Sequence, residues 1–74
     1  MDIENLKRAN EIQEELVSLG RASDIISEGR ATVTIFHGKD SDDYVVLASE
    51  GFCRALRDCI DQFITVLLEE AKTL

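Results

Sequence analysis

The sequence lacks the features that would mark a catalytic or DNA-binding protein. It contains no proline, no low-complexity tract and no internal repeat, so nothing divides its 74 residues into separate units. Its four glycines are isolated from one another, which excludes a glycine-rich phosphate-binding loop. No helix-turn-helix or zinc-finger spacing is present. We therefore expect one small, non-enzymatic domain.

Basic residues are scarce. There are 8 lysines and arginines against 15 acidic residues, which gives a formal net charge of −7. DNA binding depends on basic side chains that displace counterions from phosphates, so no DNA partner is expected. The same charge opposes anionic membrane surfaces, and the apolar stretches are too short to span a bilayer. Since Met1 begins no charged-then-apolar leader, we expect a soluble, cytoplasmic protein.

Metal ligands and thiols are few as well. Cys53 and Cys59 are six residues apart on one predicted helix, which separates their Cα atoms by roughly 9 Å, too far for a disulfide. The single histidine, His37, is remote from both, so no metal and no cofactor are expected. Asp40 and Asp42 are spaced like the start of a calcium loop. The glycine and glutamate that complete such a loop are missing, which favours a solvated acidic turn.

What the sequence does have is a last third too apolar for a helix facing one small core. Ser49 caps a helix predicted over about 50–72. Such a helix needs one apolar stripe about 100° wide, whereas this one carries two neighbouring stripes. The first stripe comprises Leu56, Ile60, Phe63 and Leu67, widened by Cys53, Ile64, Leu68 and Ala71; the second comprises Phe52, Cys59 and Val66.

We expect the chain to complete its fold by forming a homo-oligomer. A domain of this length has little core of its own, and association is one of the few ways to compensate. The expected interface residues are Phe52, Cys59, Ile60, Phe63, Ile64, Val66, Leu67 and Leu68.

An earlier helix is predicted over about 2–19. Asp2 can cap it, and Gly20 is expected to end it, although a further turn through Ile25 is compatible with the pattern. Its seam repeats every seven residues, with Ile3, Leu6 and Val17 expected to broaden it. The seam residues are Asn5, Ala9, Ile12, Leu16, Leu19, Ser23 and Ile26.

Between the helices the sequence predicts a β-hairpin. Strands are expected over about 31–37 and 44–48, joined by a polar turn over 38–43. One face, expected to lie against the helices, holds Val33, Ile35, Val45 and Leu47, and the other holds Thr32, Thr34, Phe36, Tyr44 and Val46. The predicted fold is α+β, a helix–β-hairpin–helix (α-β-β-α) within a single domain over 1–74.

A ligand site, if there is one, is expected on this hairpin. Aromatic rings stack on bases and nearby cations meet phosphates, so Phe36, His37, Lys39, Tyr44 and Arg30 would suit a nucleotide-like ligand. The alternative is that the two aromatics pack against a second subunit, as aromatics often do at interfaces.

The cations of the last helix are not expected to bind a ligand, because each has a carboxylate one turn away. The expected pairs are Glu50–Arg54, Arg54–Asp58 and Arg57–Asp61.

The segment 6–16, LKRANEIQEEL, followed by a hairpin and a long amphipathic helix, resembles small uncharacterised proteins of bacteriophages and prophages. That group includes oligomeric inhibitors of bacterial defence, which bind host proteins or sequester cyclic nucleotide signals. The resemblance implies a homo-oligomeric counter-defence protein whose partner is a bacterial protein or a cyclic nucleotide-like ligand. Two alternatives remain open. One is a purely structural self-assembling scaffold, and the other is an enzyme in which His37 and an acidic turn residue meet at a subunit interface.

Overall fold

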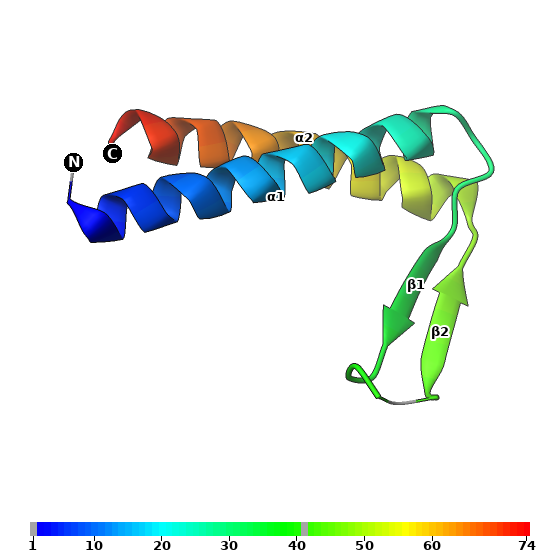
Figure 1. Cartoon of the computed structure of the whole chain (residues 1–74). Helices are drawn as coiled ribbons and strands as arrows, with labels where there is room; N and C mark the ends of the chain where they lie inside the picture. Colours follow the sequence, from blue (N-terminus) through cyan, green and yellow to red (C-terminus); the bar gives the residue numbers. More distant parts are fainter. Residues whose placement is uncertain (1, 41) are drawn as a thin grey trace.

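The chain forms a pair of antiparallel helices from which a β-hairpin projects as an arm (Figure 1). This computed structural model describes residues 2–40 and 42–74, so Ser41, in the expected turn, and Met1 lie outside the described residues. The element order is α1 (Ile3–Ser27), β1 (Val33–Phe36), β2 (Tyr44–Leu47) and α2 (Glu50–Lys72). The helix–hairpin–helix prediction is therefore confirmed. The molecule measures 42 × 29 × 14 Å along its principal axes.

Helix α1 begins and packs as its sequence predicts. The Asp2 carboxylate caps it by accepting a hydrogen bond from the Asn5 backbone N–H at 2.8 Å. Every residue of the seven-residue seam is buried or half-buried, and Ile12 is only 2% exposed. The expected broadening of the seam is wrong. Ile3, Leu6 and Val17 point to solvent, because they lie on the side of α1 away from α2.

Helix α1 does not end at Gly20 but continues to Ser27. A glycine inside a helix costs only about 1 kcal/mol relative to alanine. The turns beyond it place Ser23 and Ile26 on the seam against α2, which offsets that cost. The left-handed conformation expected of a terminating glycine is found at Gly29, with φ 87°, and it is followed by Arg30 with φ 61°.

Helix α2 spans Glu50–Lys72, against an expected range of about 50–72. The Ser49 hydroxyl caps it by accepting from the Phe52 backbone N–H at 3.3 Å. Its buried residues, Cys53, Ile60 and Leu67, recur every seven positions like the α1 seam. The contacts Arg8–Glu70 and Ser23–Arg57 define an antiparallel register. In that register Ile12 is level with Leu67, Leu19 with Ile60 and Ile26 with Cys53.

The hairpin has the predicted faces but not the predicted packing. Its register pairs Val33 with Leu47 and Ile35 with Val45, which puts these four side chains on one face as expected. The arm points away from the helices, however, instead of lying across them (Figure 1). Val33 and Leu47, at its base, are half-buried, whereas Ile35 and Val45 are 56% and 55% exposed. Periodicity determines which residues share a face, but not where that face points.

Candidate functional site

The tip of the hairpin arm brings together four of the five residues expected to bind a ligand. Phe36 and Tyr44 are cross-strand partners with ring centroids 5.8 Å apart and ring planes at 42°, and both are more than half exposed. His37 and Lys39 follow in the turn. Arg30 precedes β1 at the base of the arm, so the structure separates it from the other four. The hairpin site itself stays a prediction.

His37 contacts Asp43 across the turn. Its backbone N–H donates to the Asp43 carbonyl at 2.9 Å, and its Nδ1 lies 3.5 Å from Asp43 Oδ2. The two side chains are 85% and 78% exposed. A general acid–base pair works best where it is positioned and shielded from water. Within one subunit, the His37–Asp43 contact lies in a solvent-exposed turn and lacks that shielding.

The cysteines do not form a pair. Cys53 is buried, with its thiol donating to the Ala31 carbonyl at 3.5 Å, and Cys59 is exposed. Within residues 2–40 and 42–74, no three His, Cys, Asp or Glu side chains gather into a group that could hold a metal ion. In that same part of the chain, neither helix is long and apolar enough to cross a membrane.

The second apolar stripe of α2 is left uncovered by the rest of the chain. Phe52 is 41% exposed, Val66 57%, and Cys59 between them is also exposed. Phe63, which the sequence pattern places on the first stripe, is 46% exposed and borders this second stripe. We call these four residues the α2 stripe.

Two residues of the expected interface belong elsewhere. Ile60 is 9% exposed and Leu67 is 1% exposed, because both pack in the contact between α1 and α2 of the same chain. They are therefore not accessible to a second subunit. Ile64 is half-buried and Leu68 is 47% exposed, on the opposite edge of α2 from the α2 stripe.

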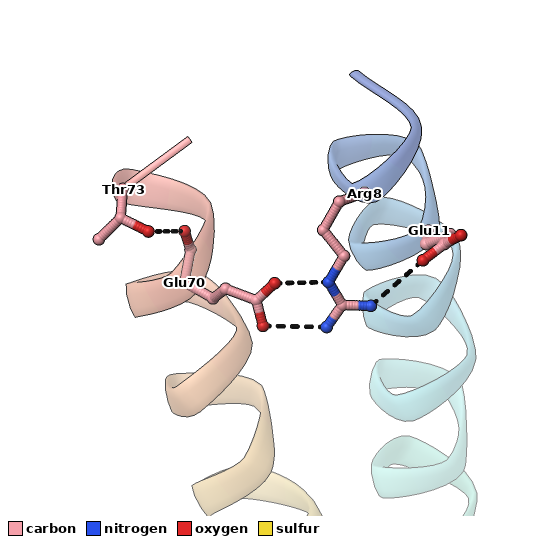
Figure 2. Close-up of polar contacts among 4 residues, drawn as sticks. All are labelled: Arg8, Glu11, Glu70 and Thr73. Carbon is pink, nitrogen blue, oxygen red and sulfur yellow. Dashed lines mark hydrogen bonds and ion pairs between the residues drawn. The ribbon is translucent and has the colours of Figure 1, made fainter. Parts of the chain in front are cut away.

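A charged contact joins the helices at the end remote from the arm (Figure 2). The Arg8 guanidinium binds the Glu70 carboxylate through two hydrogen bonds, Nε to Oε2 and Nη2 to Oε1, the latter at 2.9 Å. A third bond runs from Nη1 to Glu11 Oε2 at 3.4 Å. The hydrogen bonds from Arg8 lower the pKa of Glu70 below its ordinary value of 4.5. The carboxylate in turn raises the pKa of Arg8.

A second polar contact lies nearer the arm. Ser23, only 8% exposed, donates to Asp61 Oδ1 at 3.0 Å and accepts from Arg57 Nε at 3.3 Å. Arg57 is thereby tied to α1 instead of to a carboxylate on its own helix. Buried polar groups are expensive to leave unpaired, and Ser23 uses its hydroxyl as both donor and acceptor here.

The ion pairs expected along α2 are not formed. In the described part of the chain, Arg54 makes no ion pair or hydrogen bond with either Glu50 or Asp58, and Arg57 makes none with Asp61. The prediction that Arg54 and Arg57 form ion pairs with carboxylates on their own helix is therefore wrong. Exposed pairs of this kind gain little energy, because water and side-chain entropy compete with them.

Arg54 and Arg57 instead line a cavity at the elbow, which we define as the junction of the helix pair with the arm. The cavity has a volume of about 270 Å³ and is bounded by both helices and by the chain segments that lead into and out of the arm. Arg30 is the third arginine in its wall, and Glu50 is the single acidic residue among the described residues that line it. The apolar part of the wall comprises Ile26, Ala31, Ala48 and Cys53.

Sequence reasoning found Arg30 but missed its two neighbours. A signal was present, because Arg54 and Arg57 are three residues apart and so share one side of α2 within its first turns. The meeting with Arg30 depends on how the chain leaves α1 through Gly29, which spacing does not reveal.

Comparison with protein-family models gives no match, and comparisons with curated protein sequences and with solved structures give none either.

Proposed function

We propose that this chain is a non-enzymatic binding protein that works as a homo-oligomer, with a second copy covering the α2 stripe. The observation that carries the proposal is the amount of surface that one chain exposes. Its accessible area is 6046 Å². A compact monomer of 8.3 kDa exposes about 4,600 Å², so the excess is about 1,400 Å².

The shape supports the same conclusion. The radius of gyration is 15.0 Å, whereas about 11 Å is typical of a compact domain of this length. In the described residues only four apolar side chains are buried: Ile12, Cys53, Ile60 and Leu67. A core that small gives little free energy of folding, which favours a subunit whose fold depends on association.

The excess area has the size of a subunit interface. Stable interfaces bury about 800 Å² on each partner, and obligate ones bury more. Covering about 1,400 Å² on each of two chains falls within the obligate range. Part of this surface is the hairpin arm, whose two faces and edges are open and which is marginal as an isolated two-stranded ribbon.

The pattern of the α2 stripe favours a helix as its occupant. Phe52, Cys59 and Val66 recur every seven residues, the spacing at which one helix packs along another. No charged side chain belongs to the stripe, so two highly acidic copies can meet there without opposing carboxylates directly. The partner we assign is therefore α2 of a second copy.

The biological role that we propose rests on the sequence resemblance. Similarity in outline to small phage and prophage proteins supports a counter-defence role, in which the assembly binds a bacterial protein or sequesters a nucleotide signal. The alternative is a scaffold whose only activity is assembly. A binding site distinguishes the two, because a scaffold needs none.

The experiment measures solution mass by light scattering at micromolar concentration, with helicity by circular dichroism. The unmodified chain should have a multiple of the 8.3 kDa subunit mass. Val66→Glu should lower the mass, because it puts a charge on the apolar α2 stripe. Thr65→Glu adds the same charge at an exposed position outside the α2 stripe and should leave the mass unchanged.

A folded 8.3 kDa monomer at every dilution would contradict the proposal. If Val66→Glu keeps the mass of the unmodified chain, the copies meet through another surface and the assignment of the α2 stripe is wrong.

A further inference from the structure

We infer that the elbow cavity binds the phosphate group of a small phosphorylated compound, held by Arg30, Arg54 and Arg57. The inference adds a ligand class to the proposed binding role. The cavity lies within one chain, so the inference does not depend on self-association.

The first argument is the concentration of positive charge. Three of the five arginines of the sequence line one cavity, and only Glu50 offsets them there. This happens in a chain with a net charge of −7, where a random surface patch would be acidic. A recess lined by one sign of charge attracts the opposite sign from solution.

The second argument is that two of these cations have free hydrogen-bonding groups. Neither Arg30 nor Arg54 makes an ion pair or hydrogen bond with any other described residue. Arg57 is different, because its Nε is engaged with Ser23 on α1. It is held in place while its remaining N–H groups stay available. Guanidinium groups present paired donors at the spacing of phosphate oxygens, which makes arginine well suited to this anion.

The helix dipoles do not determine the sign of the field at the elbow. The amino end of α2, which favours anions, and the carboxyl end of α1, which disfavours them, both border the cavity. Their effects oppose each other, so the arginine side chains decide the preference. A structural alternative follows from the same geometry: α1 has no basic residue in its last turn, and these arginines would then only neutralise its carboxyl end.

The dimensions favour a small ligand. A volume of about 270 Å³ is just below the range of about 300–1,000 Å³ for small-molecule pockets, and it suits a phosphate with a compact body beside it. The apolar residues Ile26, Ala31 and Ala48 would contact that body. A nucleic acid strand would bring its other phosphates against an acidic surface, which opposes a polymer.

The test measures binding to the assembled, full-length protein by calorimetry and by amide chemical shifts. The probes are inorganic phosphate, ribose 5-phosphate, adenosine 5′-monophosphate and ribose. The three phosphates should bind and ribose should not. If the organic phosphates bind more tightly than inorganic phosphate, the apolar wall contributes to recognition. If all three bind equally, the arginines recognise the phosphate alone, and both results support the inference.

Two variants remove one guanidinium each. Arg30→Gln and Arg54→Gln should weaken phosphate binding about tenfold or more, as expected for a lost charge-assisted hydrogen bond. Neither side chain has a described partner, so the fold should persist. Arg21→Gln is the matched control, because Arg21 is exposed on α1 and is not part of the cavity wall. It should change affinity less than threefold.

Lys39→Gln and Tyr44→Ala test the hairpin tip as the competing site. The inference fails if no phosphate binds at millimolar concentration, or if Lys39→Gln abolishes binding while the two elbow variants retain it. It also fails if the elbow variants lower thermal stability without changing binding, which would assign the arginines to the α1 terminus. Solution mass, measured on each variant, reports separately on the proposed assembly.

Discussion

Arg8 and Glu70 are 62 positions apart in the sequence, yet they form a two-point contact between guanidinium and carboxylate that joins the outer ends of α1 and α2. The contact has a defined pH dependence. Because the pKa of Glu70 is lowered in the folded chain, its contribution to stability is complete above pH 4.5, the ordinary value for glutamate. That contribution is lost as the pH falls through the lower pKa of the folded state. Arg8, with a raised pKa, stays charged throughout.

We therefore expect Glu70→Gln to lower the free energy of unfolding at pH 7 and to have a smaller effect at pH 3, below the ordinary pKa of 4.5. The measurement is denaturant unfolding of the unmodified protein and of Glu70→Gln, at the two pH values and at one protein concentration. Glu69→Gln serves as the control, because among the described residues Glu69 forms an ion pair only with Lys72 on its own helix, at 3.6 Å. A difference between wild type and Glu70→Gln that is constant with pH would show that Glu70 acts through packing.

Leu67 should be among the most sensitive positions in the chain, because it is 1% exposed and is one of the four buried apolar residues of the described chain. Leu67→Ala should destabilise the protein by about 2–5 kcal/mol, enough to unfold a marginal domain. Ile3→Ala removes a similar side chain at a position that is 85% exposed, and it should change stability by less than about 0.5 kcal/mol. Equal effects in urea unfolding would mean that the helix pair is not the folding core.

The two cysteines should report on assembly through their reactivity. In one chain Cys53 is buried and Cys59 is exposed on the α2 stripe. A thiol reagent should therefore modify Cys59 slowly in the assembled protein and rapidly in the dissociated Val66→Glu variant. Cys53 should react slowly in the assembled protein, and faster in Val66→Glu to the extent that dissociation unfolds the helix pair. Cys59→Ser identifies which thiol gives the fast phase, and a Cys59 that reacts rapidly at every concentration would place the interface elsewhere.

Arg30 should be a position where glycine is more stable than the natural residue. Its φ of 61° is a left-handed conformation that costs a non-glycine residue about 1–2 kcal/mol. Glycine relieves that cost but loses more chain entropy on folding, which leaves a net gain of up to about 1 kcal/mol. Gly29→Ala, at φ 87°, should be destabilising by a similar amount. If Arg30→Gly also weakens phosphate binding, the unfavourable conformation is retained for the guanidinium and not for the fold.

The sequence correctly predicted which side of an element is apolar wherever a regular spacing of residues determines it. The seven-residue spacing of Ile12, Leu19 and Ile26 identified the buried side of α1, and alternation grouped Ile35 with Val45 on one face of the hairpin. It failed at Gly20, because the preference of one residue was outweighed by contacts with α2 that form only in the folded chain.

The meeting of the three arginines at the elbow also depends on contacts that form only in the folded chain, so the sequence did not predict it. Spacing placed Arg54 and Arg57 one turn from carboxylates, but spacing does not determine whether two exposed side chains actually pair. Their approach to Arg30 depends on the left-handed conformations of Gly29 and Arg30, which turn the chain out of α1 into the arm. The resulting direction of the arm also leaves Ile35 and Val45 exposed.

The position of the Arg8–Glu70 contact bears on how the helix pair opens. At the elbow, the helices are joined by the chain itself through residues 28–49, so they cannot move far apart there. At the other end only non-covalent contacts hold them, and closing the longer loop to Glu70 costs more entropy than closing the shorter one to Arg57. Separation of the two helices therefore begins at their outer ends. The Arg8–Glu70 pair lies at that point and holds the two ends together. Because the helices separate first at their outer ends, amide hydrogens in the first turns of α1 and the last turns of α2 should exchange faster than those near Ser23.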